Sequence, residues 1–415
     1  MRARFLIPLF LLIIGEVYSI ILVRSTLKNV PNPGKTILFI LYILLTFFTW
    51  GSFFLFRRID WAHLPHMARN IFVAFTIGFF VAKMLVGVIM LIDDLRRLVL
   101  LLALKIAPPR QEAGVPVTNG LSRSAFFKSL ALIVGGSTVG AFLYGITNRY
   151  NYQVKKLKLS FKSLPPAFRG LRIVQISDIH AGSFDNKEAV ARGVQKILDQ
   201  KPDIIFFTGD LVNNKAEEIK PYVDVFSKLK APMGVYSTLG NHDYGDYVEW
   251  PDAAQKTANL DELKALHGRM GWKLMMNEHV VFTKGEDRIA LIGIENWGAK
   301  AGFPKYGDMR KAYAGLPEQN IPFKILLSHD PSHWDAQVVT QYRDVDLTFS
   351  GHTHGMQFGV EIPGFKWSPV KYVYKNWAGI YRQGQQHLYV NRGYGFLGYP
   401  GRLGIMPEIT VIDLV

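Results

Sequence analysis

Histidine, carboxylate and amide side chains recur in five short clusters of this chain of 415 residues. The densest cluster, Gly240-Asn241-His242-Asp243, has an amide, an imidazole and a carboxylate in consecutive positions. Such side chains suit metal binding and proton transfer, although a tetrapeptide of this kind alone is also typical of a polar turn. The other four clusters are Asp178-Ile179-His180, Gly209-Asp210, Ser328-His329-Asp330 and Gly351-His352-Thr353-His354-Gly355.

Each cluster directly follows an apolar, strand-like run. Asp178 precedes Asp210 by 32 residues, and Asp210 precedes Asn241 by 31, whereas one strand–helix–strand unit takes about 30 residues. Because successive parallel strands end at the same edge of a sheet, we expect these side chains to meet there. Each cluster alone also fits a cap, a turn or a surface pair. The recurrence of all five in this order indicates a single functional site.

The elements that must position these clusters alternate along the second half of the chain. Strands are predicted at 171–177, 203–208 and 234–239, and helices at 187–199, 217–229 and 252–270. Strand-like runs then dominate, at 279–283, 288–294, 323–328, 346–350, 386–391 and 409–414. This order predicts a layered α/β domain with mixed sheets over residues 164–415. Residues 149–163 are predicted to form a linker and a first strand.

Residues 1–148 are predicted to form a four-helix transmembrane region. Four apolar runs, at 5–23, 36–56, 71–92 and 126–146, have about the 20 residues that cross a bilayer. A shorter run at 98–107 either extends the third helix or lies at the interface. Glu16 and Lys83 lie inside spans, and charges in hydrocarbon usually have a partner. The favoured interpretation is that each residue separately faces the bundle or reaches the interface, and the sharper hypothesis is an ion pair between them.

The net charge of +15 belongs almost entirely to the membrane region. Residues 1–160 have 19 Lys and Arg against 5 Asp and Glu, and the remaining residues have 29 against 28. Basic residues that flank apolar spans indicate contact with anionic lipid headgroups, and the later domain lacks the basic surplus that nucleic-acid binding needs. The chain has no cysteine, which excludes thiolate nucleophiles and cysteine zinc sites.

The order D-x-H, G-D, G-N-H-D, H-D and G-H-x-H resembles that of the calcineurin-like metallophosphoesterases, over roughly residues 157–415. The tail, from Val390-Asn391-Arg392-Gly393 to Met406-Pro407-Glu408-Ile409, is similar to that of a bacterial membrane-associated phosphodiesterase branch. Members usually have Gly-Gly-Gln after the last metal-binding histidine. This chain has Gly355-Met356-Gln357, so we expect the pocket beside His354 to differ in shape.

The resemblance implies two divalent metal ions (Mn²⁺, Fe or Zn²⁺) bridged by one carboxylate. Its motifs assign the first ion to Asp178, His180, Asp210 and His354, and the second to Asp210, Asn241, His329 and His352. Carboxylate, amide and imidazole ligands independently suit these ions better than Ca²⁺. Two such ions lower the pKa of a shared water to near neutrality and clamp phosphoryl oxygens for in-line attack.

Three further residues receive expected roles near the metals. The resemblance makes His242 the catalytic group that stabilises or protonates the leaving oxygen, with Asp243 orienting it. Asp330 either supports His329 or is a solvated surface residue. Arg402 is a candidate phosphate contact.

The segment Gly393-Tyr394-Gly395-Phe396-Leu397-Gly398 matches G-x-G-x-x-G, but Tyr399-Pro400-Gly401 follows where a nucleotide-binding fingerprint requires a helix. We therefore interpret the segment as an aromatic loop at the rim of the site. Its aromatic residues and five others either contact lipid or pack in a β-rich cap, the five being Trp367, Tyr372, Tyr374, Trp377 and Tyr381.

The sequence thus predicts a membrane-anchored, metal-dependent phosphoric ester hydrolase that cleaves a phosphodiester or pyrophosphate bond, with a lipid-linked or envelope substrate. A nucleotide-sugar lipid is one specific possibility, and it requires a cytoplasmic active site. The main alternative is a catalytically silent scaffold of the same fold at the membrane, but such members typically lack ligands or the G-N-H-D histidine. A transporter with a regulatory domain would need more spans.

We expect an integral protein of the bacterial inner membrane. The positive-inside rule does not orient it, because nine basic residues fall on each side. Ser122-Arg123-Ser124-Ala125-Phe126-Phe127 resembles a twin-arginine export signal whose second arginine is replaced by Ser124. Ordinary membrane insertion is the alternative, and an extracytoplasmic catalytic domain is expected with either mechanism if the run at 126–146 enters from the cytoplasm.

Overall fold

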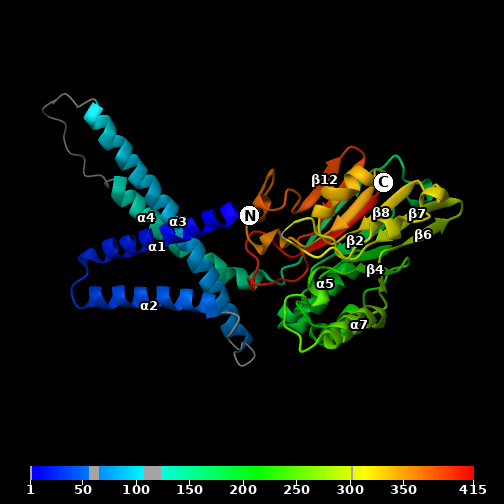
Figure 1. Cartoon of the computed structure of the whole chain (residues 1–415), viewed down its shortest axis with the longest axis horizontal. Helices are drawn as coiled ribbons and strands as arrows, with labels where there is room; N and C mark the ends of the chain where they lie inside the picture. The colour runs from blue at the N-terminus through cyan, green and yellow to red at the C-terminus, as the bar shows by residue number, and fades with distance from the viewer. Residues whose placement is uncertain (1, 56–64, 107–122, 301) are drawn as a thin grey trace. The chain divides into compact units, whose positions relative to one another are not determined.

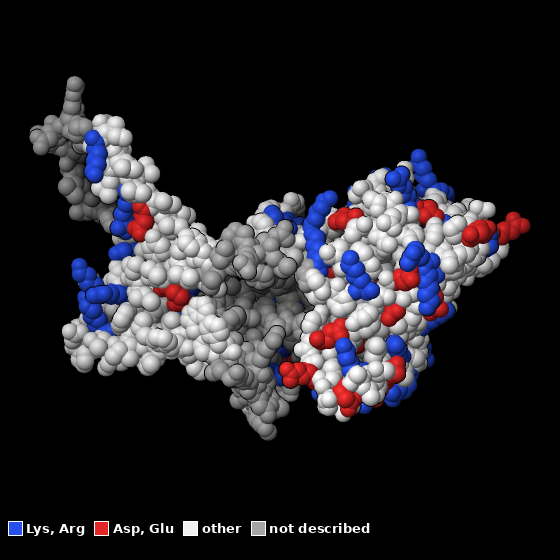
Figure 2. All heavy atoms as spheres, in the orientation of Figure 1, with Lys and Arg blue, Asp and Glu red and all other residues white. Residues whose placement is uncertain are grey.

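The structure is a computed structural model that describes residues 2–55, 65–106, 123–300 and 302–415 (Figure 1). It divides into two compact units, Met1–Ile146 and Thr147–Val415. On the face drawn in Figure 2, acidic and basic side chains are interspersed over the second unit, whereas most of the first unit is uncharged.

Four long helices make up the described part of the first unit. They are α1 (Arg2–Thr26), α2 (Gly34–Leu55), α3 (His66–Ile106) and α4 (Arg123–Gly145). All four are long and apolar enough to cross a membrane, which confirms the predicted four-helix transmembrane region within the described residues. Phe56, the last residue of the predicted span 36–56, lies outside the described residues. Because α3 continues to Ile106, the short apolar run at 98–107 extends the third helix. Only the last residue of that run, Ala107, lies outside the described part of the chain.

The structure contains the hypothesised ion pair between Glu16 and Lys83, in place of the favoured interpretation that the two residues are separate. Lys83 Nζ donates to both carboxylate oxygens of Glu16, at 2.7 and 2.9 Å, and Trp50 Nε1 donates to the same carboxylate at 2.8 Å. The helices meet closely beside the pair, since a Cβ on Gly15 would lie 2.7 Å from the Lys83 carbonyl oxygen. Small residues commonly permit such approach between membrane helices.

Replacing one partner tests the energetic role of this pair. We expect Lys83→Met to lower the free energy of unfolding by about 3 kcal/mol, because Glu16 keeps a buried charge without its cation. The double variant Glu16→Gln/Lys83→Met removes both charges and is expected to recover most of the loss. Thermal unfolding of both variants in detergent measures this, and a double variant no more stable than Lys83→Met would contradict it.

The second unit contains two six-stranded sheets. The first has the order β1-β14-β2-β3-β4-β5, and β2, β3 and β4 run parallel. Its strands are β1 (Gln153–Leu159), β14 (Glu408–Leu414), β2 (Arg172–Ile176), β3 (Ile204–Thr208), β4 (Val235–Thr238) and β5 (Lys273–Leu274). The predicted linker region therefore includes β1, which pairs with the last strand of the chain.

The second sheet has the order β12-β13-β9-β8-β7-β6, with parallel pairing from β13 to β7 and antiparallel edge strands. Its strands are β12 (Gly379–Gln383), β13 (Gln386–Val390), β9 (Leu347–Ser350), β8 (Phe323–Leu327), β7 (Asp287–Gly293) and β6 (Glu278–Lys284). A small hairpin, β10 (Val360–Ile362) and β11 (Phe365–Trp367), stands apart from both sheets. The predicted α/β class with mixed sheets is confirmed.

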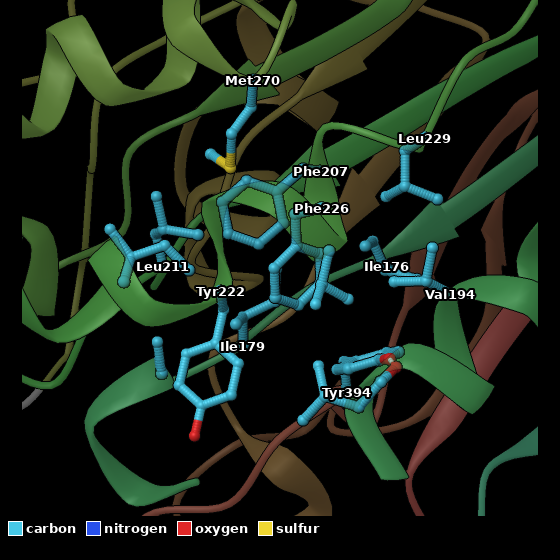
Figure 3. Close-up of a cluster of buried hydrophobic side chains, with 14 of the residues drawn as sticks. Ile176, Ile179, Val194, Phe207, Leu211, Tyr222, Phe226, Leu229, Met270 and Tyr394 are labelled. Carbon is cyan, nitrogen blue, oxygen red and sulfur yellow. Dashed lines mark hydrogen bonds between the residues drawn. The ribbon is translucent and has the colours of Figure 1, made fainter. Parts of the chain in front are cut away.

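Alternate residues of the strands serve two different cores. Ile173 and Phe206 of the first sheet pack with Phe349 of the second, so one core lies between the sheets. Their chain neighbours Val174 and Phe207 belong to another core, part of which Figure 3 shows around Phe207, Phe226 and Tyr394. This alternation is the period of two that strands impose.

Helices cover the outer faces of both sheets. The first sheet is covered by α5 (Lys187–Leu198), α6 (Val223–Phe226) and α7 (Ala253–Arg269) (Figure 1). The predicted helix 217–229 begins as a 3₁₀ segment, Ala216–Tyr222, which contains Pro221. The second sheet is covered by α8 (Met309–Tyr313) and by the segment from Trp334 through α9 (Val339–Gln341).

Candidate metal centre

All seven predicted metal ligands follow the carboxyl ends of five strands from the two sheets. Asp178 and His180 follow β2, Asp210 follows β3, Asn241 follows β4, His329 follows β8, and His352 and His354 follow β9. Because β2, β3 and β4 are parallel, as are β8 and β9, the strands of each sheet deliver these groups to one edge.

Three of these residues form a first group. Asp178, His180 and His354 each offer one ligand atom, and these atoms lie within 4.8 Å of one another. His354 Nε2 is 3.3 Å from Asp178 Oδ1. All three side chains are buried.

A second group consists of Asp210, His329 and His352, again with ligand atoms within 4.8 Å of one another. His329 Nε2 lies 3.2 Å from Asp210 Oδ2 and 3.3 Å from His352 Nδ1. Asn241 joins them through its Oδ1, which is 2.8 Å from His352 Nδ1.

One carboxylate oxygen faces both groups. Asp210 Oδ2 is 3.5 Å from His180 Nε2 in the first group and 3.2 Å from His329 Nε2 in the second. The other oxygen, Oδ1, accepts the backbone N–H of His242 at 2.9 Å, which fixes the orientation of the carboxylate.

The polar atoms of the site fit divalent metal ions. Neither ring nitrogen of His180 nor Nε2 of His354 has a hydrogen-bond partner, although these atoms are buried. Buried polar atoms in native proteins are nearly always satisfied, and a metal ion would satisfy these. His329 Nδ1 donates to the Thr208 carbonyl at 2.6 Å, which leaves Nε2 as the ring nitrogen that could bind a metal ion. The set of nitrogen and oxygen donors suits Mn²⁺, Fe or Zn²⁺.

The electrostatics of the site without metal also favour a cation. Burial, reinforced by the negative charge of Asp210, raises the pKa of Asp178 to about 7. Burial lowers the pKa of His352 to about 4 and also lowers that of His180, so these rings stay neutral and able to bind metal. Burial opposes protonation of His329 as well, but Asp210 and Asp178 outweigh it and raise its pKa to about 10. A metal ion can replace that proton.

The backbone at the ligands is strained. Asp178, His180, Asp210, His352 and His354 all have φ between 48° and 70°, the left-handed region that non-glycine residues rarely adopt. Such conformations cost on the order of 1–3 kcal/mol each and persist where the surrounding structure enforces them. Here the sharp turns direct side chains of successive strands toward one another.

Glycines beside the ligands allow the carboxylates to approach the backbone. A Cβ on Gly240 would lie 2.2 Å from Asp210 Oδ1, and one on Gly351 would lie 2.2 Å from Asp178 Oδ2. Neither position has room for a side chain, so the glycines of the G-N-H-D and G-H-x-H motifs are required sterically.

His242 lies half-buried beside the two groups, and its ring centroid is 4.9 Å from that of His180. Its Nδ1 is 2.7 Å from the Asn213 carbonyl, to which it donates. Asp243 was expected to orient this ring, but its carboxylate instead accepts the backbone N–H groups of Asp210, Leu211 and Gly240 at 2.7–2.9 Å. The prediction for Asp243 is corrected: it holds the loop that bears Asp210, and the Asn213 carbonyl orients His242.

Arg402 does not reach a position where it can contact a phosphate. Its side chain is fully buried and donates to the carbonyls of Arg392 at 2.7 Å and Gly393 at 3.2 Å. Its NH2 also lies 3.4 Å from His354 Nδ1. The predicted phosphate contact is therefore wrong, and Arg402 braces the loop beneath His354.

The glycine-rich loop lies beneath the site rather than at its rim. The backbone N–H of Gly395 donates to the Asp178 carbonyl at 2.8 Å, and Tyr394 is buried in the core of the first sheet. No helix follows Gly398 among the described residues up to Val415. This agrees with the interpretation that the segment is not a nucleotide-binding fingerprint.

Two tyrosines that position ligands were not expected from the sequence. Tyr247 accepts a hydrogen bond from Asn241 Nδ2 at 2.9 Å, which turns Asn241 Oδ1 toward His352. Tyr374 OH lies 2.8 Å from His352 Nε2, and Asp330 is buried 3.6 Å from the same nitrogen. Asp330 therefore supports His352 rather than His329. Only the position of Tyr247 shortly after the G-N-H-D motif could have indicated its role.

Family models match both units of the chain. Residues 171–356 match "Calcineurin-like phosphoesterase", and residues 1–149 match "Probable Calcineurin-like phosphoesterase, transmembrane domain". A Bacillus subtilis protein named "Uncharacterized metallophosphoesterase YkuE" is 31% identical over 304 residues, which cover 71% of this chain and 98% of that protein. The chain belongs to the calcineurin-like phosphoesterase family. This confirms the resemblance drawn from the order of the five clusters.

Two other relatives of this phosphoesterase extend the comparison. A Danio rerio "Transmembrane protein with metallophosphoesterase domain" is 32% identical over 293 residues, which cover 69% of this chain but only 62% of that protein. A Chlamydia trachomatis "UDP-2,3-diacylglucosamine pyrophosphatase LpxG" is 27% identical over 284 residues, which cover 56% of this chain and 81% of that protein.

Gly240→Ala tests whether the close approach at the Asp210 carboxylate is needed for metal binding. We expect most of the bound metal to be lost and stability to fall by about 2 kcal/mol, because the new Cβ overlaps Asp210 Oδ1. The control is Gly268→Ala in α7, where a Cβ would have no neighbour within 4 Å. Elemental analysis measures the bound metal, and thermal unfolding measures the stability, of both full-length variants. Equal metal content in the two variants would contradict the expectation.

Proposed function

We propose that this phosphoesterase hydrolyses a phosphodiester or pyrophosphate bond with two divalent metal ions that share Asp210. The observation that supports this most directly is that Asp210 Oδ2 faces both ligand groups, at 3.5 Å from His180 Nε2 and 3.2 Å from His329 Nε2. Asp178, His180 and His354 hold the first ion, and Asn241, His329 and His352 hold the second. When bound, two such ions polarise phosphoryl oxygens and lower the pKa of water.

In this proposal the protein residues orient the ligands and move one proton. Thr208, Tyr247 and Tyr374 hold ligand side chains from behind, at 2.6–2.9 Å, so the ligands need little rearrangement. His242 donates through Nδ1 to the Asn213 carbonyl, so Nε2 is the nitrogen that can deliver a proton to the leaving oxygen. General acid catalysis of this kind is worth about 10²–10⁴-fold in rate.

We propose a lipid-linked substrate at the cell envelope. The transmembrane helices confine the enzyme to a membrane, where a lipid-linked phosphoester is concentrated. The name of the Chlamydia trachomatis relative, a pyrophosphatase that acts on a nucleotide-linked diacyl sugar, also supports this class. A silent scaffold is disfavoured because all seven ligand positions and His242 are filled.

The direct test is hydrolysis by detergent-purified full-length protein with added Mn²⁺. A chromogenic phosphodiester, its monoester and a micellar lipid phosphodiester serve as substrates. We expect His242→Ala to lose about 10²–10⁴-fold in kcat while retaining bound metal, because its ring is not a ligand. Asp210→Asn is expected to lose both activity and metal. Full metal occupancy in the unaltered protein without turnover of any of the three substrates would contradict the proposal and favour the scaffold.

We also propose that the catalytic domain is extracytoplasmic in the bacterial inner membrane, on the basis of the export-like sequence at the start of α4. A pair of reporters fused after Val415 tests this, one active only in the cytoplasm and one only outside it. Activity of the external reporter alone is expected. Activity of the cytoplasmic reporter alone would reverse the orientation and suit a nucleotide-linked lipid substrate.

A further inference from the structure

The hairpin of β10 and β11 contacts the rest of the domain through its polar side chains, and most of its apolar side chains are exposed. The strand register pairs Val360 with Trp367, Glu361 with Lys366, and Ile362 with Phe365. Directly opposed residues of an antiparallel pair share a face, and successive residues alternate. One face therefore presents the aliphatic and aromatic side chains, and the other presents Glu361 and Lys366.

The polar face is fixed to the domain by specific contacts. Glu361 Oε1 accepts from the buried Arg392 at 2.7 Å, and Lys366 Nζ donates to the Ala378 carbonyl. These bonds set which way the hairpin faces. Its apolar face is exposed as a result: Ile362 is 58% exposed, Phe365 55% and Val360 42%. This is the reverse of the burial that a hairpin on a soluble protein normally shows.

Tyr372 and its neighbours extend this apolar face. Trp367 Nε1 donates to Tyr372 OH at 3.4 Å, and Tyr372 and Val373 are 74% and 52% exposed. Lys371 and Lys375 are exposed beside them, and in the described part of the chain neither has a carboxylate within ion-pair distance. We call Val360, Ile362, Phe365, Trp367, Tyr372, Val373, Lys371 and Lys375 the hairpin surface.

The hairpin surface is continuous in sequence with the metal centre. Tyr374, two residues after Tyr372, contacts His352 Nε2. On the other side, Ser368, which follows β11, donates to the carbonyl of Gly355 at 2.8 Å, next to the ligand His354. A molecule bound to the hairpin surface therefore lies beside the loops that bear His352 and His354, two of the seven predicted metal-binding residues.

We propose that the hairpin surface inserts into the interfacial layer of a lipid bilayer and so brings lipid-linked phosphoesters to the metal centre. Exposed contiguous apolar surface marks a binding site. Tyrosine, tryptophan and lysine around aliphatic side chains match the membrane interface, with its apolar depth and anionic headgroups. Because four helices of the chain are long and apolar enough to cross a membrane, the domain is tethered to a bilayer. The catalytic consequence rests on the function proposed above, whereas the lipid contact does not.

The absence of cysteine permits a direct test with a single introduced thiol. Ile362→Cys is labelled with an environment-sensitive fluorophore, and the full chain is reconstituted in vesicles of phosphatidylcholine and phosphatidylglycerol that contain spin-labelled lipid. The matched control is Glu286→Cys, an exposed position between β6 and β7. Since interfacial segments lie within reach of acyl chains, we expect about threefold or greater quenching at position 362 relative to 286.

Equal quenching at the two positions would overturn the proposal. Emission at position 362 that shifts to shorter wavelength without lipid quenching would also overturn it, because a second copy of the chain or another protein segment would then cover the surface. Neither result depends on catalysis.

A hydrolysis experiment tests the consequence for substrate delivery. We expect Ile362→Asp/Phe365→Asp to lower turnover of a vesicle-embedded lipid phosphodiester by about tenfold, because charged residues resist insertion, and to leave turnover of a soluble chromogenic diester unchanged. Equal losses on both substrates would overturn the delivery role. If the unaltered protein hydrolyses neither substrate while position 362 is quenched by lipid, the proposed function fails and the lipid contact stands.

Discussion

Two buried carboxylates among four histidine rings impose the constraint on which the second unit depends. Asp178 and Asp210 are almost completely removed from water, and burial together with the negative charge of Asp210 raises the pKa of Asp178. Without a metal ion, protons relieve this charge, because burial raises the pKa of Asp178 and Asp210 outweighs burial to raise that of His329. Bound metal ions would supply the positive charge and would satisfy both ring nitrogens of His180 and Nε2 of His354, which have no hydrogen-bond partner. The buried carboxylates and the ring nitrogens without hydrogen-bond partners would therefore be fully satisfied only with bound metal ions.

The fold meets this constraint by uniting the strand ends of two sheets. Parallel strands in each sheet bring the ligands to one edge, and the core between the sheets, with Phe206 against Phe349, fixes the two edges relative to each other. The strained left-handed turns at the ligands persist because the strands before them are fully buried. Asp243 strengthens this arrangement by accepting backbone N–H groups of the loop after β3. Rigidity in the sheets thus maintains strain in the loops.

Much of this could be predicted from the sequence. The strands before Asp178, Asp210 and Asn241 are short, apolar and evenly spaced, so periodicity alone located them, and the motif order then identified the family. Roles that depend on which groups a side chain contacts in the folded protein could not be predicted. Nothing local distinguishes an Asp243 that orients His242 from one that accepts backbone N–H groups. Arg402 lies far along the chain, and only the tertiary structure shows that carbonyl groups enclose it. The strands β10 and β11 have three residues each, too few for a periodic signal.

The number and magnetic coupling of bound Mn²⁺ ions would show whether two metal ions share Asp210. Full-length protein in detergent would be titrated with Mn²⁺ and followed by electron paramagnetic resonance, because two ions that share a carboxylate oxygen couple magnetically. We expect Mn²⁺ binding to saturate at two ions per chain with the spectrum of a coupled pair, since Asp210 Oδ2 faces both ligand groups. Saturation at one ion per chain, or two ions with the spectrum of isolated Mn²⁺, would contradict it.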